Sequence, residues 1–376
     1  MSKKLFIVVN EDRFFLSHRK DIAIKAMQEG YDVTIVCKDT GQHCDVKSLG
    51  LMVTDLPINP TGENIVQELK TFWFLCKLYL KERPDVVHHV GLKNILWGGL
   101  AAYLCRTKGV VNAVSGLGTL FNGNTPSITA RITMMIMRIS NNRKNVIVIF
   151  QNHEDESLFY RYKVVKKEQV TFIKGSGVDL AEFNYTPIPL NKGKIHVIFT
   201  GRMVREKGVL FLTEAAEMMR KTYEEKVDFW LCGRLSSTPN ALTEEELRSH
   251  CDGNYIKWLG HRNDIIELLR KSTLVAFPSF YREGVPKSLI EAAAIGRPII
   301  TCDSIGCKDT VDDGINGFLI PIKDSKALAE KLSFLIERPE LCIEMGKASR
   351  RKAEKEFALE HVVNTHINVY NSLSGR

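Results

Sequence analysis

Short apolar runs alternate with longer amphipathic stretches along almost the whole chain. The runs, such as residues 4–10 and 195–200, are rich in Val and Ile, as the buried strands of parallel sheets are. The stretches between them carry apolar residues at helical spacing, so the pattern predicts an α/β fold with parallel sheets. The predicted strands are residues 4–10, 32–37, 51–55, 85–90, 109–114, 146–150 and 170–173, then 195–200, 227–232, 255–259, 273–277, 298–302 and 317–320.

The predicted strands form two groups, separated by a segment rich in proline and turn formers at residues 185–193. Both groups show the same strand and helix alternation without a sequence repeat, which predicts two doubly wound domains. A chain of 376 residues also exceeds what one hydrophobic core usually organises. The predicted helices are residues 18–29, 63–82, 94–105 and 153–161, then 209–220, 288–294, 325–337 and 343–372.

Several broad classes of protein are excluded by the distribution of apolar residues and cysteines. No uninterrupted apolar segment approaches the roughly 18 residues that a membrane-spanning helix needs. The first residues lead directly into a strand, which is not the pattern of a secretory signal. The nine cysteines are scattered without a C-x-x-C motif, which favours reduced thiols in the core. We therefore expect a cytoplasmic protein.

The loop that follows the predicted strand 273–277 carries two carboxylates. Glu283 lies in the loop and Glu291 lies in the first turns of the next helix, with a Gly-Val-Pro turn between them. In an open α/β sheet such a loop lies at the carboxyl ends of the strands, where ligands bind. Two carboxylates there suit two hydroxylated groups of one ligand. Ordinary helix and loop glutamates are the alternative.

The turn after strand 195–200 supplies the opposite charge. It contains Gly201, Arg202 and Lys207 and leads into the predicted helix 209–220. An Arg fork and a mobile Lys can together neutralise a diphosphate, although solvated loop cations remain the alternative. No D-x-D motif occurs in the chain, so these cations would replace a metal ion. We expect no metal and no cofactor.

The combination of Gly201 and Arg202 with Lys207, followed by Glu283 and Glu291 at E-x7-E spacing, resembles glycosyltransferase family 4. These are retaining enzymes that use nucleotide sugars and have the GT-B fold. Residues 10–19, 85–89 and 115–118 are similar to the bacterial surface-polysaccharide members, of the capsule and O-antigen type.

The resemblance implies two doubly wound Rossmann-like parallel-sheet domains that face a cleft. Residues 1–185 would form the acceptor-binding domain and residues 186–355 the nucleotide-sugar domain. Residues 356–376 would form a C-terminal helix that crosses back to the first domain.

The resemblance also implies roles for the second domain's residues. Arg202 and Lys207 would bind the diphosphate and stabilise the leaving charge. Glu283 would hold the transferred sugar, and Glu291 would accept hydrogen bonds from the ribose. The other predicted donor contacts are Gly201, Gly284, Val285, Ser288, Leu289 and, near the nucleobase, Arg262.

Site residues in the first domain follow from the same resemblance. His88 and His89 are adjacent on a predicted strand and point to opposite faces, so at most one would reach the ligand. We favour His89 as a catalytic residue, with a hydrogen-bonded structural histidine as the equal alternative. His18 at the start of a helix and the turn with Gly116 and Gly118 suit an acceptor phosphate, and plain turn geometry is the alternative for the glycines.

The predicted function is retaining transfer of a hexose or N-acetylhexosamine from a nucleotide sugar, with UDP as the expected nucleotide, to a lipid-linked saccharide. Two other classes stay open: a non-hydrolysing nucleotide-sugar epimerase, and a binding protein without catalytic activity. A dinucleotide-dependent oxidoreductase is disfavoured because residues 10–16 lack a G-x-G-x-x-G motif.

The positive charge is concentrated in the first half of the chain. Residues 1–180 contain 24 Lys and Arg against 17 Asp and Glu, whereas the remaining residues contain 28 against 27. No nucleic-acid reader motif occurs, so an anionic inner-membrane surface is the expected partner. Residues 127–140 are apolar and carry Arg131 and Arg138 on one helix face, as an interfacial helix would. A Met-rich core helix is the alternative.

Overall fold

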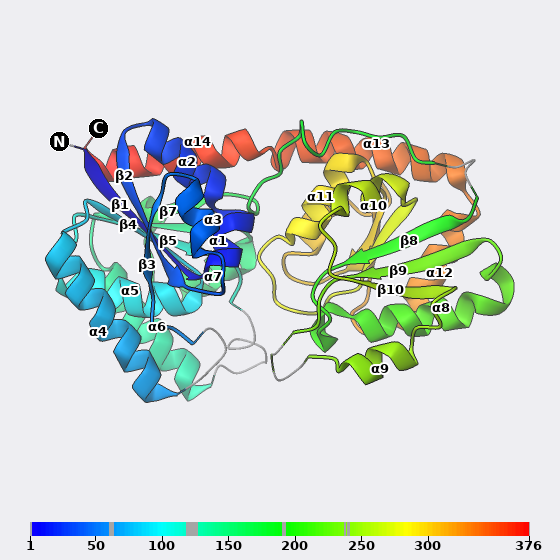
Figure 1. Cartoon of the computed structure of the whole chain (residues 1–376), viewed down its shortest axis with the longest axis horizontal. Helices are drawn as coiled ribbons and strands as arrows, with labels where there is room; N and C mark the ends of the chain where they lie inside the picture. The colour runs from blue at the N-terminus through cyan, green and yellow to red at the C-terminus, as the bar shows by residue number, and fades with distance from the viewer. Residues whose placement is uncertain are drawn as a thin grey trace. The chain divides into compact units, whose positions relative to one another are not determined.

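The computed structural model describes residues 2–59, 64–117, 127–189, 193–236, 238 and 241–375. The chain forms two compact units, each an α/β domain built on a parallel sheet (Figure 1). The first unit comprises Met1–Ser176 with Glu360–Arg376, and the second comprises Gly177–Leu359. The prediction of two doubly wound parallel-sheet domains is confirmed.

The first unit contains a sheet of seven described strands in the order β3-β2-β1-β4-β5-β6-β7, and all the pairings between them are parallel. The order reverses direction at β1 and β4, which are neighbours. Strands β4 and β5 are buried along their whole length because helices cover both faces of the sheet. The strands are β1 (Lys3–Glu11), β2 (Tyr31–Lys38), β3 (Met52–Asp55), β4 (Val86–Val90), β5 (Gly109–Val114), β6 (Val146–Phe150) and β7 (Val170–Phe172).

Three consecutive helices, α4, α5 and α6, cover one face of this sheet. The connections that contain them all advance in the same direction along the sheet, and right-handed crossovers then place their helices on one side (Figure 1). The helices of the unit's N-terminal part are α1 (Asp12–His18), α2 (Lys20–Gln28), α3 (His43–Ser48), α4 (Ile65–Glu82), α5 (Leu92–Leu104), α6 (Ile128–Asn141), α7 (His153–Arg161) and the 3₁₀ helix η2 (Lys167–Gln169).

The predicted helix at residues 18–29 is wrong in its start. Helix α1 already begins at Asp12, and a break at Arg19, with φ −135° and ψ −5°, separates it from α2. Asp12 is buried and accepts hydrogen bonds from the backbone N–H groups of Thr40 at 2.9 Å and Gln42 at 3.0 Å. This contact anchors the beginning of α1 to a loop almost thirty residues away, which local periodicity does not reveal.

The second unit contains a sheet of six described strands in the order β10-β9-β8-β11-β12-β13, again with parallel pairings. The strands are β8 (Ile195–Thr200), β9 (Val227–Cys232), β10 (Ile256–Gly260), β11 (Leu274–Phe277), β12 (Ile299–Cys302) and β13 (Gly317–Ile320). The helices are η3 (Arg205–Lys207), α8 (Val209–Tyr223), α9 (Glu244–Ser249), α10 (Ile265–Lys271), α11 (Lys287–Ile295), η4 (Lys308–Thr310), α12 (Ser325–Ile336) and α13 (Pro339–Glu356).

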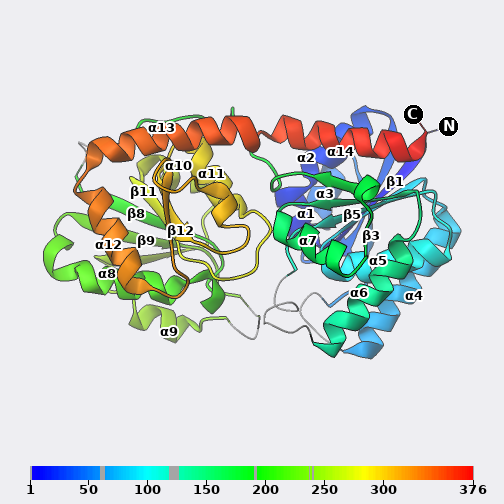
Figure 2. The same cartoon turned by 180° about the vertical axis from the view of Figure 1, so that it is seen from behind.

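The last helix, α14 (Leu359–Ser374), belongs to the first unit, as predicted (Figure 2). The Tyr370 hydroxyl shares a hydrogen bond of 2.7 Å with His88 Nδ1 of β4, and the Tyr31 hydroxyl donates to Asn371 Oδ1 at 2.9 Å. The predicted single helix at residues 343–372 is two helices, α13 and α14, separated at Phe357 with φ −122° and ψ 9°. Phe357 is fully buried, so the break is held by core packing.

The boundaries of the units differ from the expected domain limits. The first unit ends at Ser176 rather than at residue 185, and its C-terminal segment begins at Glu360 rather than at residue 356. Among the described residues, no helix is both long and apolar enough to cross a membrane.

Candidate functional site

The carboxyl ends of β8 and β11 form the switch point of the second sheet. These two strands are neighbours, while β9 and β10 lie on one side of them and β12 and β13 lie on the other. In open α/β sheets, ligands bind outside the carboxyl ends of the strands at this point. The loop after β8 contains Gly201, Arg202 and Lys207, and the loop after β11 contains Glu283. The fold therefore brings the two predicted motifs together.

An ion pair joins the two loops. Lys207 Nζ contacts Glu283 Oε1, and the two side chains are only 12% and 13% exposed. The buried Ser279 hydroxyl donates to the same carboxylate oxygen at 3.2 Å. Lys207 Nζ also lies 4.9 Å from the centroid of the Phe277 ring, where the ring's quadrupole attracts a cation. A cation, a carboxylate and a hydroxyl are thus held at one point of the sheet edge.

The backbone fixes the position of the Glu283 loop. The N–H groups of Phe280 and Tyr281 both donate to the Glu206 carbonyl, at 2.9 Å and 3.2 Å. Gly208 has φ +77°, and a Cβ there would lie 2.0 Å from the Pro278 carbonyl oxygen, so the close approach of the two loops requires glycine. The sequence motif Gly201 to Gly208 therefore includes a residue that shapes the site without a functional side chain.

A third loop, after β12, packs against the backbone of Glu283 and Gly284. Gly306 has φ +84°, and a Cβ there would lie 1.5 Å from the Gly284 carbonyl oxygen. Ser304 Oγ donates to the Ser279 carbonyl oxygen at 2.8 Å. Ser279, Ser304 and Gly306 were not predicted, because a lone Ser or Gly in a loop carries no signal of what it contacts.

Glu291 lies on α11 with an unusual ionisation. Its side chain is 16% exposed, and burial raises its pKa to about 7, although Lys287 Nζ at 3.7 Å opposes the shift. Strongly shifted pKa values occur often at functional sites, and also in buried structural groups. Glu291 therefore stays a candidate for ligand binding on its burial and on its position in α11.

The N-terminus of α11 meets the same edge. Its N-cap is Pro286, which makes no side-chain cap, and the side chain of Ser288 is partly exposed in the first turn. Free N–H groups at a helix N-terminus attract anions. Leu289 differs, because its N–H donates to the Pro286 carbonyl at 3.1 Å and its side chain is fully buried. Gly284 and Val285 are buried in the loop before the helix.

The two predicted arginine contacts have different surroundings. The Arg202 side chain is exposed in the turn after β8, directly beside the switch point. Arg262 follows β10, two strands away from β8, and makes a bidentate pair with Asp264 at 2.8 Å and 2.6 Å. The Arg262 fork is therefore already engaged within its own loop.

In the first unit, His89 is held as a structural residue. It is fully buried on β4, its Nδ1 donates to Asn112 Oδ1 at 2.8 Å, and its Nε2 accepts from the Tyr79 hydroxyl at 2.8 Å. Burial lowers its pKa to about 4. A Cβ on Gly98 of α5 would lie 2.4 Å from the ring, so the helix is shaped around it. This geometry matches the structural alternative for His89, and its catalytic role stays a prediction.

His88 lies on the opposite face of the same strand, as the pleat predicts. It is also fully buried, and it faces Tyr370 of α14 rather than a ligand surface.

The predicted acceptor contacts are described only in part. His18 ends α1 instead of starting a helix, its Nδ1 lies 2.6 Å from Ser17 Oγ, and its ring stacks on Phe14 with centroids 4.4 Å apart. Gly116 has φ +100°, which a turn after β5 by itself explains. Gly118 lies outside the described residues.

Comparison with known families decides the class of this protein. Residues 194–338 match the family model described as glycosyl transferases group 1, and residues 4–152 match the one described as glycosyl transferase 4-like. EpsD of Bacillus subtilis (strain 168), a glycosyltransferase by name, is 33% identical over 388 residues, which cover 99% of this chain and 97% of EpsD. The chain belongs to glycosyltransferase family 4.

Two further proteins are similar to this glycosyltransferase. The Campylobacter jejuni N,N'-diacetylbacillosaminyl-diphospho-undecaprenol alpha-1,3-N-acetylgalactosaminyltransferase is 26% identical over 344 residues, covering 88% of this chain and 89% of that enzyme. The crystal structure of Anabaena Alr3699/HepE in complex with UDP superposes with a TM-score of 0.77 at 18% identity, covering 98% of this chain and all of HepE. At that identity the superposition shows the shared fold, which is GT-B.

Proposed function

We propose that this glycosyltransferase transfers a hexose or N-acetylhexosamine from a UDP-sugar to a lipid-linked saccharide, with retention of the anomeric configuration, during surface-polysaccharide biosynthesis. The observation that carries the proposal is the buried Lys207–Glu283 pair at the switch point between β8 and β11. The UDP complex of HepE supports the choice of nucleotide. The acceptor in the name of the Campylobacter enzyme supports a lipid diphosphate carrier.

The donor diphosphate would bind to the cations of the loop after β8. Within the chain, Lys207 is neutralised by Glu283, so an approaching diphosphate competes with that carboxylate for the ammonium group. Once Lys207 turns to the phosphates, Glu283 becomes available to accept hydrogen bonds from sugar hydroxyls. Arg202, exposed beside them, adds the second positive charge. The exchange would couple diphosphate binding to sugar binding at one point.

Catalysis would be mainly electrostatic. As the bond between the sugar C1 and the phosphate oxygen breaks, negative charge grows on the diphosphate, where Lys207 and Arg202 stabilise it. The acceptor oxygen forms the new bond to C1 on the same face, and its proton passes to the departing phosphate oxygen. This route retains the configuration and needs no protein nucleophile. It agrees with the pairing of Glu283 to Lys207, which favours a carboxylate that binds rather than attacks.

Helix α11 would supply the remaining contacts to the donor. We assign Glu291 to the ribose hydroxyls and the first turn of α11, at Ser288, to the phosphates. Because cations neutralise the diphosphate, we propose that the reaction needs no metal ion. Activity should persist in EDTA, and full loss of activity that Mg²⁺ restores would contradict this assignment.

The lipid-linked acceptor would place the enzyme at a membrane. We propose a cytoplasmic protein that attaches to the inner face of the cell membrane, where it meets the carrier lipid. The positive charge of the first half of the chain is consistent with such a surface.

The deciding experiment combines donor binding with transfer. Thermal stabilisation is measured with UDP-, GDP-, ADP- and dTDP-sugars in EDTA, and nucleotide release is then measured with and without a synthetic diphospho-lipid saccharide. We expect selective stabilisation by one UDP-sugar and nucleotide release that depends on the acceptor. In the NMR spectrum of the product, the new glycosidic bond should have the same anomeric configuration as the sugar in the donor. An inverted linkage would overturn the retaining mechanism. Conversion of the donor to its epimer without acceptor would favour an epimerase.

A further inference from the structure

Arg19 and Arg297 are both almost completely buried, at 2% and 0% exposure, but their surroundings differ. The Nε and Nη2 atoms of Arg297 donate to the carbonyls of Leu269 at 2.8 Å and Arg270 at 3.1 Å, and its Nη1 atom donates to two further carbonyls. Arg19, at the break between α1 and α2, donates through Nη1 to the His18 carbonyl at 3.0 Å. Its Nε atom has no hydrogen-bond partner among the residues that the structure describes. The guanidinium of Arg19 is therefore incompletely hydrogen-bonded.

The positive charge of Arg19 is not paired within the described part of the chain, where no carboxylate forms an ion pair with its guanidinium. Burial lowers the pKa of Arg19 to about 10, an effect that the Tyr370 phenol of α14 opposes, and the group stays charged near pH 7. A buried charge is costly unless an opposite charge or a full set of hydrogen bonds compensates it. Arg297 has such hydrogen bonds, whereas Arg19 has neither form of compensation from the described residues.

Two buried histidines lie beside Arg19. His88 of β4 and His366 of α14 are 0% and 2% exposed, and their ring centroids are 5.4 Å apart. Burial lowers the pKa of both rings, and the charge of Arg19 lowers both further because the guanidinium lies near each ring. The Nε2 atoms of both rings have no hydrogen-bond partner in the described chain. Three buried nitrogen atoms with unused hydrogen-bonding capacity therefore belong to one group, which we call the Arg19–His366 cluster and which consists of Arg19, His88 and His366.

The hydrogen bonds of the two rings decide what each ring offers at Nε2. The Val362 carbonyl can only accept, so His366 Nδ1, 2.8 Å away, carries a hydrogen, and the neutral ring has a lone pair at Nε2. His88 Nδ1 lies 2.7 Å from the Tyr370 hydroxyl, and when that hydroxyl donates, His88 Nε2 carries the hydrogen. With the Nε–H group of Arg19, the cluster offers two donors while His366 is neutral and three donors once His366 is protonated.

We propose that the Arg19–His366 cluster binds a small halide anion such as chloride. The anion would neutralise the guanidinium and accept hydrogen bonds from Arg19 Nε and His88 Nε2. It would bind together with one proton, which His366 Nε2 takes up and donates to the anion. Exposures of at most 2% favour an ion of about the size of a water molecule over a phosphate group. The ion would connect the α1–α2 break, β4 and α14, and it involves none of the residues assigned to the sugar donor.

Binding of the anion would depend on pH through His366. The titratable groups around this ring are Arg19 at the α1–α2 break, His88 of β4 and Tyr370 of α14, with Tyr31 of β2 next to Tyr370. Arg19 stays protonated and burial raises the pKa of Tyr370, so neither group titrates near neutral pH. Burial lowers the pKa of His366 to about 3, so the ring is neutral until the anion brings a proton. The affinity for the anion should therefore rise as the pH falls.

The test is thermal unfolding of the full chain in sodium chloride and in sodium gluconate at equal ionic strength. Gluconate is too large for a site this deeply buried. Chloride at about thirty times its dissociation constant should shift the folding equilibrium about thirtyfold toward the folded chain, which raises the melting temperature by a few degrees. The rise should be larger at pH 6 than at pH 8. Equal melting temperatures in the two salts would overturn the proposal, as would a chloride effect that does not depend on pH.

Arg19→Met removes the charge and the Nε donor, so it should abolish the difference between the two salts. The matched control, Arg297→Met, removes an equally buried charge whose donors are used by carbonyls, and it should lower the melting temperature in both salts but keep the chloride effect. Equal chloride effects in the two variants would overturn the site. If Arg19→Met does not fold, wild-type crystals soaked in sodium bromide decide the question. An anomalous scattering peak between Arg19, His88 and His366 would confirm the anion, and its absence would show that the cluster binds at most a water molecule.

Discussion

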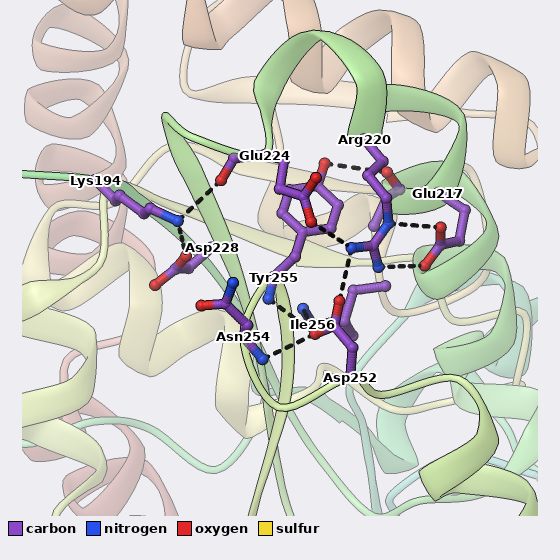
Figure 3. Close-up of polar contacts among 10 residues, drawn as sticks. Lys194, Glu217, Arg220, Glu224, Asp228, Asp252, Asn254, Tyr255 and Ile256 are labelled. Atoms are coloured by element: carbon purple, nitrogen blue, oxygen red, sulfur yellow. Dashed lines mark hydrogen bonds and ion pairs between the residues drawn. The ribbon is translucent and has the colours of Figure 1, made fainter.

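Charged residues lie at both ends of the strands of the second sheet, here called the amino edge and the carboxyl edge. The two groups differ in how far hydrogen bonds within the chain stabilise their charges. At the amino edge, the Arg220 guanidinium near the end of α8 donates to Glu217 at 2.8 Å and 2.7 Å, to Glu224 at 2.8 Å and to Asp252 at 2.6 Å (Figure 3). It also lies over the Tyr255 ring, 4.6 Å from the centroid. At the carboxyl edge, Arg202 is exposed and Glu291 has a raised pKa.

At the amino edge, hydrogen bonds and ion pairs within the chain stabilise the charged groups. Burial would raise the pKa of Asp252, but hydrogen bonds from the backbone N–H groups of Asn254, Tyr255 and Ile256 and from Arg220 hold it at about 2. Lys194 donates to the Glu224 carbonyl at 2.9 Å in the same region (Figure 3). Every charge in this group is stabilised by the chain itself, so the network serves the fold.

The charged groups at the carboxyl edge are less completely stabilised by the chain in two respects. Burial there disfavours the charge of Glu291 instead of stabilising it, and in the proposed function the Lys207–Glu283 pair separates when the diphosphate binds. The difference teaches that charge density alone does not identify a site. The position of the charges relative to the sheet matters as well, because ligands of open α/β sheets bind where the strands end.

The largest expected effect is the loss of turnover when a charge at the carboxyl edge is removed. We expect Lys207→Ala, Arg202→Ala and Glu283→Ala each to lower turnover by roughly 10² to 10⁴, because each removes a preorganised interaction with the donor. The melting temperature should change little for Arg202→Ala, which is exposed. Steady-state nucleotide release with saturating acceptor measures the effect.

The matched control for this prediction is Arg205→Ala. Arg205 is a neighbouring loop cation that pairs with Glu246 at 2.6 Å on the exterior, and its loss should leave turnover near normal. Near-normal turnover in all three site variants would contradict the assigned site.

The opposite pattern is expected at the amino edge. Arg220→Ala should lower the free energy of unfolding by roughly 1 to 3 kcal/mol, because it removes the cation shared by the Asp252, Glu217 and Glu224 carboxylates. The turnover of the folded fraction should stay unchanged. Urea unfolding followed by circular dichroism measures the first quantity and single-concentration activity the second.

Arg248→Ala provides the comparison variant for Arg220. Arg248 is 67% exposed and pairs with Glu244, and such a surface pair contributes less than about 1 kcal/mol. If Arg220→Ala were no more destabilising than Arg248→Ala, the network would not be a stabilising unit.

A smaller effect is expected from the ionisation of Glu291. Ribose hydroxyls donate to a carboxylate better than to a neutral carboxyl group, so the affinity for UDP should rise by about tenfold between pH 6 and pH 8, as a group with a pKa of about 7 ionises. Glu291→Gln should remove this dependence. Isothermal titration calorimetry across the pH range measures it, and a wild-type affinity independent of pH would exclude Glu291 from the ribose contact.

The contribution of Glu291 to the stability of the protein should change with pH in the opposite direction to the affinity for UDP. Its pKa in the folded chain lies above the ordinary value of 4.5, so Glu291 stays protonated to a higher pH in the folded state than in the unfolded state. The contribution of Glu291 to stability is therefore present below pH 4.5 and is lost as the pH rises to about 7. Glu291→Gln should remove that decline.

The smallest expected effect concerns Asp252. Its pKa is depressed to about 2, so its contribution is present above its ordinary pKa of 3.8 and is lost as the pH falls through about 2. Asp252→Asn should lower the melting temperature at pH 7, and the difference from the wild type should shrink below pH 4. A difference that stays constant down to pH 2 would show that the carboxylate charge does not matter there.

Much of the fold could be predicted because its signals are local. The strands and the loops that follow them depend on apolar runs and turn formers within ten or so residues, and the predicted strands coincide with β1 to β13. The short helices α3, α9 and α10 escaped prediction, since six or seven residues hardly establish a period. The helix breaks at Arg19 and Phe357 escaped it because distant contacts hold them.

The local motifs of the candidate site could also be predicted, but the contacts between them could not. The motifs around Lys207 and Glu283 were found separately, but their pairing across 76 residues depends on the register of β8 against β11. For His88 and His89, the pleat predicted opposite faces. Their burial depends on α14 for His88 and on α4 and α5 for His89, which no local pattern could show.

By itself, the amino-acid sequence determined the alternation of strands and helices, the two domains and the loops that carry the charges, because these follow from the spacing of neighbouring residues. Tertiary structure alone decided which charges are buried and hydrogen-bonded within the chain and which face solvent. Arg297, for example, is fully buried and donates to the carbonyls of Leu269, Arg270 and Thr186, whereas Arg202 faces solvent. The two arginines look alike in the sequence. They differ because burial and hydrogen bonding are set by segments far apart in the chain, which meet only when the sheet is assembled.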